Sequence, residues 1–258
     1  MDARQAAFRA EYQQKISPRY SGWLHGAWIA GAGLGYIGVV LAQVDRGGWA
    51  WLSFAVAFAV ANLGEWALHR YVLHRRIPAL SALWHRHTVE HHHYFTQDCM
   101  TVDSHREYRI IFFPPYAVLG IAAIHLLLGA LWSLPFGRDA MWIWMAGGMS
   151  HYLLYEILHT AAHLPEHPLL RRLPAVNTMR RNHWIHHHHA LMSTWNMNLT
   201  VPLADWLFGS SDLDCGLWRT LGNGYRMDRL RPEVRDALPD SAFPPSAAGR
   251  GRDTAARS

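Results

Sequence analysis

Histidine is concentrated in four short stretches of this chain, and each stretch repeats it at spacings that place imidazoles side by side. The chain holds 19 histidines among its 258 residues. The densest stretch is NHWIHHHH, residues 182–189, which is interrupted and internal and therefore does not resemble an expression tag. Imidazole is the commonest metal ligand among side chains. The four stretches together predict a metal site.

Ten of these histidines are candidate ligands because of their spacing. His159 and His163 are four residues apart and share one helix face. His69 and His74 are five residues apart, about 140° around a regular helix, so the helix must end or distort for both to bind one metal. Ten ligands are enough for two metals. We predict as ligands His69, His74, His87, His91, His92, His159, His163, His183, His186 and His187.

Nearby carboxylates are expected to orient the imidazoles by accepting the N–H of the second ring nitrogen. Glu156 precedes His159 by three residues and therefore faces nearly the same way on a helix. For Glu90, an ion pair with an arginine is an equally good interpretation. We predict the orienting role for Glu65, Glu156 and Asp205.

Other histidines are expected to lie outside the metal site. A lone histidine on an apolar helix is more often packed than coordinated, which applies to His125. His188 and His189, which follow the last cluster, are also predicted to lie outside the site. We predict that replacement of any of these three has a mild effect.

The composition and the apolar runs indicate an all-α integral membrane protein. Hydrophobic residues make up 50% of the chain, and it holds 13 tryptophans. Four segments approach the ~20 apolar residues that span a bilayer, and short connections join them into two helical hairpins. A soluble bundle with buried helices is the less favoured interpretation. The predicted spans are residues 23–44, 49–68, 110–134 and 141–164, the third despite the pair Pro114 and Pro115.

The distribution of arginine predicts the topology. The short connections carry one arginine each, Arg46 and Arg138, whereas the other polar segments carry many. By the positive-inside rule both termini and the histidine clusters are cytoplasmic. The net charge of +5, beside these apolar runs, favours an anionic membrane surface over nucleic acid as the partner. We expect a cytoplasmic segment at 1–22, a membrane domain with a histidine-rich helical cap at 23–238, and a disordered tail at 239–258.

The order of the histidine motifs resembles a known family. HRYVLH, HTVEHH, HTAAH and HWIHH follow one another as in the fatty acid hydroxylase and sterol desaturase superfamily of membrane di-iron oxygenases. YEILHTAAH and the later WNMNLTVPLADWLFGS are also similar to family blocks, so the resemblance covers residues 65–210. HTVEHH departs from the usual spacing, with three residues before the double histidine. His85 and His93 are also available there; we favour His87, His91 and His92.

The resemblance implies a chemistry. Two iron ions would bind dioxygen and remove a hydrogen atom from an unactivated carbon of a lipid, which gives hydroxylation or desaturation; zinc can substitute in purified protein. A fatty acyl or related lipid is the expected substrate, and a carotenoid or sterol-type reaction is the alternative. A histidine-rich metal-binding or transport protein is less favoured, because relay residues should run through the bilayer. Haem binding needs ligands on facing helices rather than double histidines.

Oxygen activation also requires electrons from a second protein. The sequence has no glycine-rich dinucleotide motif after a strand, and Cys99 and Cys215 are too few for an iron–sulfur cluster. No polar stretch is large enough for a fused cytochrome b5-like domain. We therefore expect a ferredoxin or a cytochrome b5-like donor with its reductase. The arginines expected to attract this acidic donor, or lipid phosphates, are Arg171, Arg172, Arg180 and Arg181.

Overall fold

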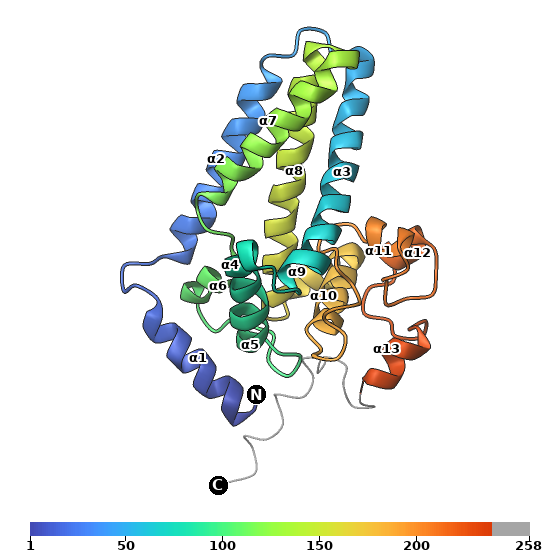
Figure 1. Ribbon diagram of the computed structural model, residues 1–258. Helices are drawn as coiled ribbons and strands as arrows, with labels where there is room; N and C mark the ends of the chain where they lie inside the picture. The colour runs from blue at the N-terminus through green and yellow to red at the C-terminus, as the bar shows by residue number, and fades with distance from the viewer. Residues whose placement is uncertain (239–258) are drawn as a thin grey trace.

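The computed structural model describes residues 1–238, and in that range it is all helical, with no β-strand. Four long helices stand side by side, and a group of short helices covers one end of them (Figure 1). Residues 239–258, for which the sequence predicts disorder, lie outside the described residues. The all-helical architecture expected from the sequence is confirmed.

The four long helices form two antiparallel hairpins (Figure 1). The first hairpin joins α2, Gly22–Leu41, through the 3₁₀ turn η1, Gly48–Trp51, to α3, Leu52–Leu68. The second joins α7, Ala117–Phe136, to α8, Arg138–His163. Helix α8 packs against α2, α3 and α7 and is therefore the central helix of the four.

A carboxylate links the two hairpin turns at the end away from the short helices. The turn between α7 and α8 is made by Gly137, whose φ of 83° favours glycine. Two residues after it, Asp139 accepts hydrogen bonds from the backbone N–H groups of Asp45, Arg46 and Gly47 at 3.0–3.1 Å. The two short connections predicted from the sequence are thus held together.

Three helical segments are long and apolar enough to cross a membrane: Gly22–Leu41, Gly48–Leu73 and Ala117–Phe136. They expose large apolar side chains; Leu134 is 81% exposed. Such a surface is suited to lipid. The predicted start of the third span at residue 110 is wrong, because Pro114 and Pro115 separate the short helix α6, Tyr108–Ile111, from α7. Proline has no N–H with which to continue a helix.

The fourth predicted span corresponds to α8, which is not among these three candidates. Most of α8 is buried by the other helices, and it carries Glu156 and three histidines. A helix enclosed by others needs less apolar surface, so its composition alone does not identify it as a span.

The remaining elements form a structure at one end of the long helices that we call the cap (Figure 1). Two of its segments, η2 and η4, are π-helical. The cap consists of α1 Ala3–Lys15, η2 His69–Leu73, η3 Pro78–Leu80, α4 Ser81–Trp84, η4 His85–His91, α5 His92–Tyr94, η5 His105–Glu107, α6 Tyr108–Ile111, α9 Pro168–Arg171, α10 Pro174–His186, α11 Leu203–Leu207, α12 Leu217–Leu221 and α13 Pro232–Ala237.

Candidate metal centre

Nine of the ten predicted ligands come together in two buried groups. Within each group, one ring nitrogen from every histidine lies within 4.8 Å of the others. We call them the first and the second group. The first group is His69, His74, His87, His92 and His186, and the second is His91, His163, His183 and His187.

Two π-helical turns explain how histidines five residues apart reach one group. In η2 the N–H of His74 bonds to the carbonyl of His69, five residues back, at 3.2 Å. In η4 the N–H of His92 bonds in the same way to the carbonyl of His87. A π turn brings residues i and i+5 onto one face, and such turns are frequent at functional sites. The distortion that the spacing of His69 and His74 requires is therefore present.

The π turn also changes the predicted grouping of one block. His87 and His91 are four residues apart, so a regular α-helix would place them on one face. In the structure His87 joins His92 in the first group, and His91 belongs to the second. The reason is that the i, i+4 rule holds for an α-helix and not for the π-helical η4.

His159 is the predicted ligand that falls outside both groups. Its Nε2 lies 3.2 Å from the Nε2 of His91, so it adjoins the second group. His125, His188 and His189, which the sequence places outside the site, belong to neither group. Metal binding by any of the ten remains a prediction, but the structure brings all ten rings close together.

Backbone carbonyls, rather than carboxylates, fix the orientation of the rings. His69 Nδ1 donates to the carbonyl of Met197 at 2.6 Å, and His187 Nδ1 donates to that of Phe95 at 2.6 Å. With the proton on Nδ1, Nε2 carries the lone pair that a metal needs. The same arrangement holds for His163 with Met100 O at 2.8 Å, His186 with Trp195 O at 3.0 Å and His91 with Ile110 O at 3.3 Å.

Within each group, lone pairs then face one another. His74 Nδ1 lies 3.3 Å from the hydroxyl of Thr88, which itself donates to Leu73 O, so the Nδ1 of His74 is the donor and its Nε2 is unprotonated. That Nε2 is 3.0 Å from the unprotonated Nε2 of His186. No hydrogen bond can join two such atoms, whereas a cation between them would be bound by both.

The spacing of these nitrogens suits a metal. In the second group, His183 Nε2 lies 2.9 Å from that of His163 and 3.0 Å from that of His187. Two imidazole nitrogens at right angles around a metal, each about 2.1 Å from it, would be about 3.0 Å apart. The donor set in the structure therefore fits a bound transition metal.

Burial keeps several imidazoles of the two groups neutral. Desolvation, followed by neighbouring imidazoles, lowers the pKa of His87, His92 and His186 well below the usual value. Burial has the same effect on the pKa of His183 and His187. Neutral imidazole is the form that binds metals, so these residues are ready for coordination at neutral pH.

Asp205 and Glu65 support the imidazoles indirectly, through the backbone of a loop. Asp205 accepts the backbone N–H groups of Met197 at 2.9 Å and Asn198 at 2.7 Å, and thereby holds the carbonyl that orients His69. Glu65 accepts from the backbone of Leu199 in the same loop. Contrary to expectation, neither carboxylate contacts the imidazole of a candidate ligand directly, because the loop backbone lies between the carboxylate and His69.

Glu156 and Glu90 also lie away from the metal-facing rings. Glu156 is buried and accepts from the N–H of Phe113 at 3.2 Å and the hydroxyl of Tyr152 at 2.9 Å, rather than from His159. Glu90 lies 3.7 Å from His85. Glu156 therefore fixes the start of the segment that precedes α7.

Sequence reasoning missed His151, which belongs to the same polar network as Glu65. Its Nε2 lies 3.1 Å from Glu65 Oε2 and 3.1 Å from Thr200 Oγ1. Asn62 donates to the same hydroxyl at 2.9 Å. A single histidine on an apolar helix gives no spacing signal, so only the position of Glu65, four residues before His69, hinted at this network.

The N-terminal helix α1 supports the second group. Gln5 donates to the carbonyls of Tyr94 at 2.9 Å and Cys99 at 3.2 Å, on either side of the turn that leads to Met100. Arg9 is 4% exposed and forms an ion pair of 2.8 Å with Glu107, which is 1% exposed. The segment that presents Phe95 and Met100 to the histidines is thus fixed by α1.

Two of the four arginines expected to attract an electron donor are buried. Arg181 is fully buried in an ion pair of 3.0 Å with Asp212. Arg180 donates to the carbonyls of Ala161 and Leu164. Their proposed place on the surface is wrong, because partners far along the chain enclose them. Arg171 and Arg172 are exposed.

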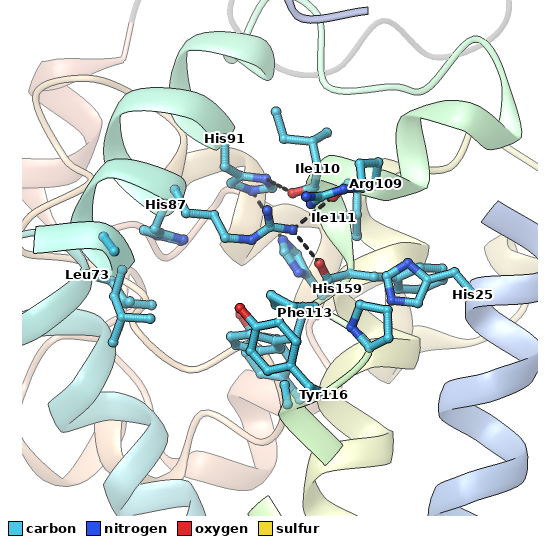
Figure 2. Close-up of a pocket in the computed structure, with 18 of the residues that line it drawn as sticks. His25, Leu73, His87, His91, Arg109, Ile110, Ile111, Phe113, Tyr116 and His159 are labelled. Carbon is cyan, nitrogen blue, oxygen red and sulfur yellow. Dashed lines mark hydrogen bonds between the residues drawn. The ribbon is translucent and has the colours of Figure 1, made fainter. Parts of the chain in front are cut away.

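A cavity of about 460 Å³ opens beside the histidines where the cap meets the long helices. Figure 2 shows His87 and His91 on one wall of this cavity and Arg109 and His25 on the other. Most of its lining is apolar, including Leu73, Phe113 and the prolines before α7. A cavity of this size and character is suited to part of a lipid chain.

The comparison with protein families agrees with this geometry. The family model described as fatty acid hydroxylase matches residues 54–210, more than half of the chain, and the match includes all ten histidines. This chain belongs to the fatty acid hydroxylase family. No significant match was found among the curated proteins or the solved structures. Membership in the fatty acid hydroxylase family, with three apolar helices, indicates a membrane-bound oxidoreductase.

Proposed function

We propose that this protein is a membrane di-iron oxygenase that hydroxylates or desaturates a C–H bond of a fatty acyl or related lipid. The observation that supports this most is the pair of buried histidine groups beside an apolar cavity. One iron ion would be held by each group, and zinc would be able to replace it. Bound iron would supply the activation of dioxygen and the removal of hydrogen from an unactivated carbon, which side chains alone do not achieve.

The residues of the chain have three tasks in this proposal. The carbonyls of Met197, Met100 and Phe95 hold the imidazoles in the tautomer that leaves Nε2 free. The apolar lining of the cavity excludes water and orients the lipid chain. His91 belongs to the second group and also lines the cavity. A carbon of a lipid bound in the cavity would therefore lie next to the second group.

We further propose that α8 is a fourth span and that the cap and the N-terminus are cytoplasmic. Arg46 and Arg138 lie at the hairpin turns, whereas the cap holds many more arginines, as the positive-inside rule requires. Single cysteines at Ser133 and Ser17, in a chain without Cys99 and Cys215, test this. In intact cells an impermeant thiol reagent should label Ser133→Cys and not Ser17→Cys; the reverse pattern contradicts the proposal.

The electrons are proposed to come from a separate ferredoxin or cytochrome b5-like protein with its reductase. Cys99 and Cys215, the two cysteines of the chain, are too few to ligate an iron–sulfur cluster. Purified protein given iron, oxygen and lipid should be inactive, and addition of a donor and its reductase should start turnover. Sustained turnover with NADPH and no added protein contradicts this part of the proposal.

Two measurements test the function itself. The purified protein should contain about two iron ions per chain and lack the Soret band of haem. Cells that produce it should accumulate a lipid with one additional oxygen or one additional double bond, and cells that produce the His186→Ala variant should not. Unchanged lipids in cells supplied with a working donor, or identical lipids with the variant, contradict the assignment.

A further inference from the structure

Two arginines line the cavity beside the histidine groups, although its other walls are mostly apolar. Arg86 lies on η4, directly before the candidate ligand His87, and Arg109 lies on α6. Figure 2 shows Arg109 on the wall that faces His87 and His91. Tyr20 lines the same cavity and adds a hydroxyl. A purely hydrocarbon ligand would not need this polar end.

Neither arginine forms an ion pair in the part of the chain that the structure describes. No carboxylate lies within 4.0 Å of either guanidinium among residues 1–238. Arg86 donates instead to two neutral carbonyls, those of Arg109 and Phe112, both at 2.8 Å. Arg109 Nη1 is buried and has no acceptor among the described residues.

The acids nearest to this pair are occupied elsewhere. Glu156 accepts from the Phe113 N–H and the Tyr152 hydroxyl, and Glu90 faces His85. Arg86 Nη2 donates to the backbone carbonyl of Arg109, so the two arginines are neighbours in the wall of the cavity. Two neighbouring cations in a mostly apolar cavity are unfavourable unless an anion joins them.

We propose that this cavity binds an amphiphile by an anionic end group, a carboxylate or a phosphate monoester, and that Arg109 recognises the charge. The guanidinium of arginine matches either group with two parallel N–H donors. The apolar walls would take the adjoining hydrocarbon chain. The inference rests on the proposed function only in so far as the bound amphiphile is the substrate; binding itself requires no turnover.

Direct binding to the purified full-length protein tests this in a neutral detergent. Dodecanoate, dodecyl phosphate and dodecanol share a chain of twelve carbons and differ at the end group. Both anions should bind more tightly than dodecanol, and the tighter of the two identifies the end group. Arg109→Gln should weaken binding of the anions about 10- to 100-fold, the usual loss for a hydrogen bond to a charged group, and should leave dodecanol unchanged.

Two further variants separate recognition from folding and from net charge. Arg172→Gln removes the same charge from an exposed position and should change none of the three affinities. Arg109→Lys keeps the charge without the planar fork, so it should retain a reduced preference for the anions. The inference is overturned if dodecanol binds as tightly as the anions, or if Arg109→Gln weakens all three ligands equally.

The outcome is independent of catalysis. Binding is measured without oxygen or an electron donor, so a chain that oxidises no lipid can still show the preference for anions. Conversely, a chain that oxidises lipid but binds dodecanol and dodecanoate equally would contradict this inference and leave the proposed function standing.

Discussion

The two histidine groups differ in the backbone that builds them. Four of the five rings in the first group lie in the π-helical segments η2 and η4 or directly after them, at a spacing of five residues. Three of the four rings in the second group come from the regular helix α8 and the end of α10, with His183 and His187 four residues apart. The first group therefore depends on local distortion, and the second on the packing of regular helices.

The supports of the two groups differ as well. The loop behind the first group is held by Asp205, which comes later in the chain than every histidine of the groups. The loop behind the second group is held by α1, which comes before them all. Different segments of the chain thus support the two groups, so each group can be perturbed separately.

The largest expected effect is the loss of one ligand from either group. His187→Ala removes a ring whose Nε2 faces that of His183, and His74→Ala removes one that faces His186. Each variant should lose turnover and about half of the bound iron, while the protein stays in the membrane. Iron analysis and lipid oxidation measure this, with the exposed His189→Ala as the control. Full iron content and normal turnover in His187→Ala would exclude that residue as a ligand.

The next effect concerns the support of the second group by α1. Arg9→Met leaves Glu107 buried without its cation, and breaking a buried pair in this way costs about 3–5 kcal/mol. The midpoint of thermal unfolding should fall strongly, and iron should be lost from the second group before the first. Lys15→Met, which breaks the exposed pair with Glu11, should leave the midpoint almost unchanged, because solvent screens an exposed pair. Equal effects of the two variants would show that α1 does not support the centre.

A smaller effect is expected from the support of the first group. Asp205→Asn weakens the hold on the Met197 carbonyl, which orients His69. Loss of such an indirect support typically lowers metal affinity about 10- to 100-fold. Competition with a chelator should show one of the two irons leaving earlier, with Asp228→Asn at an exposed pair as the control. If both irons leave together, the two groups do not have separate supports.

The sequence is informative about the ligands because metal binding restricts residue type and spacing. The ten histidines were predicted from spacing and resemblance, and the spacing of His69 and His74 already required a distorted helix. The split between His87 and His91 was not predictable, since the pattern HTVEHHH is compatible with an α- or a π-helical turn. Only the hydrogen bond from His92 to His87 distinguishes the two.

Contacts between distant residues could not be predicted in the same way. Any residue has a carbonyl, so nothing marks Met197 or Phe95 as the groups that orient imidazoles. The sequence suggests a surface position for Arg181, because nothing in it marks Asp212 as the partner with which the arginine is buried. The apolar runs predicted the long helices, but the enclosed position of α8 depends on three neighbours and has no signature in its own composition.

The smallest effect on the metal centre is expected for His125, a buried histidine on α7 that belongs to neither group. His125→Ala should leave iron content and turnover unchanged.

The ring of His125 instead packs against α8 at Gly148, where a Cβ would lie 2.1 Å from His125 Nδ1. Such an approach is impossible without a shift, so Gly148→Ala should lower the unfolding midpoint. The double variant should recover much of that loss, because the new methyl group then fills the space that the ring left. Unfolding midpoints of the four proteins measure the coupling. An effect of Gly148→Ala that His125→Ala does not relieve would place the conflict elsewhere, and loss of iron in His125→Ala would extend the metal centre into the long helices.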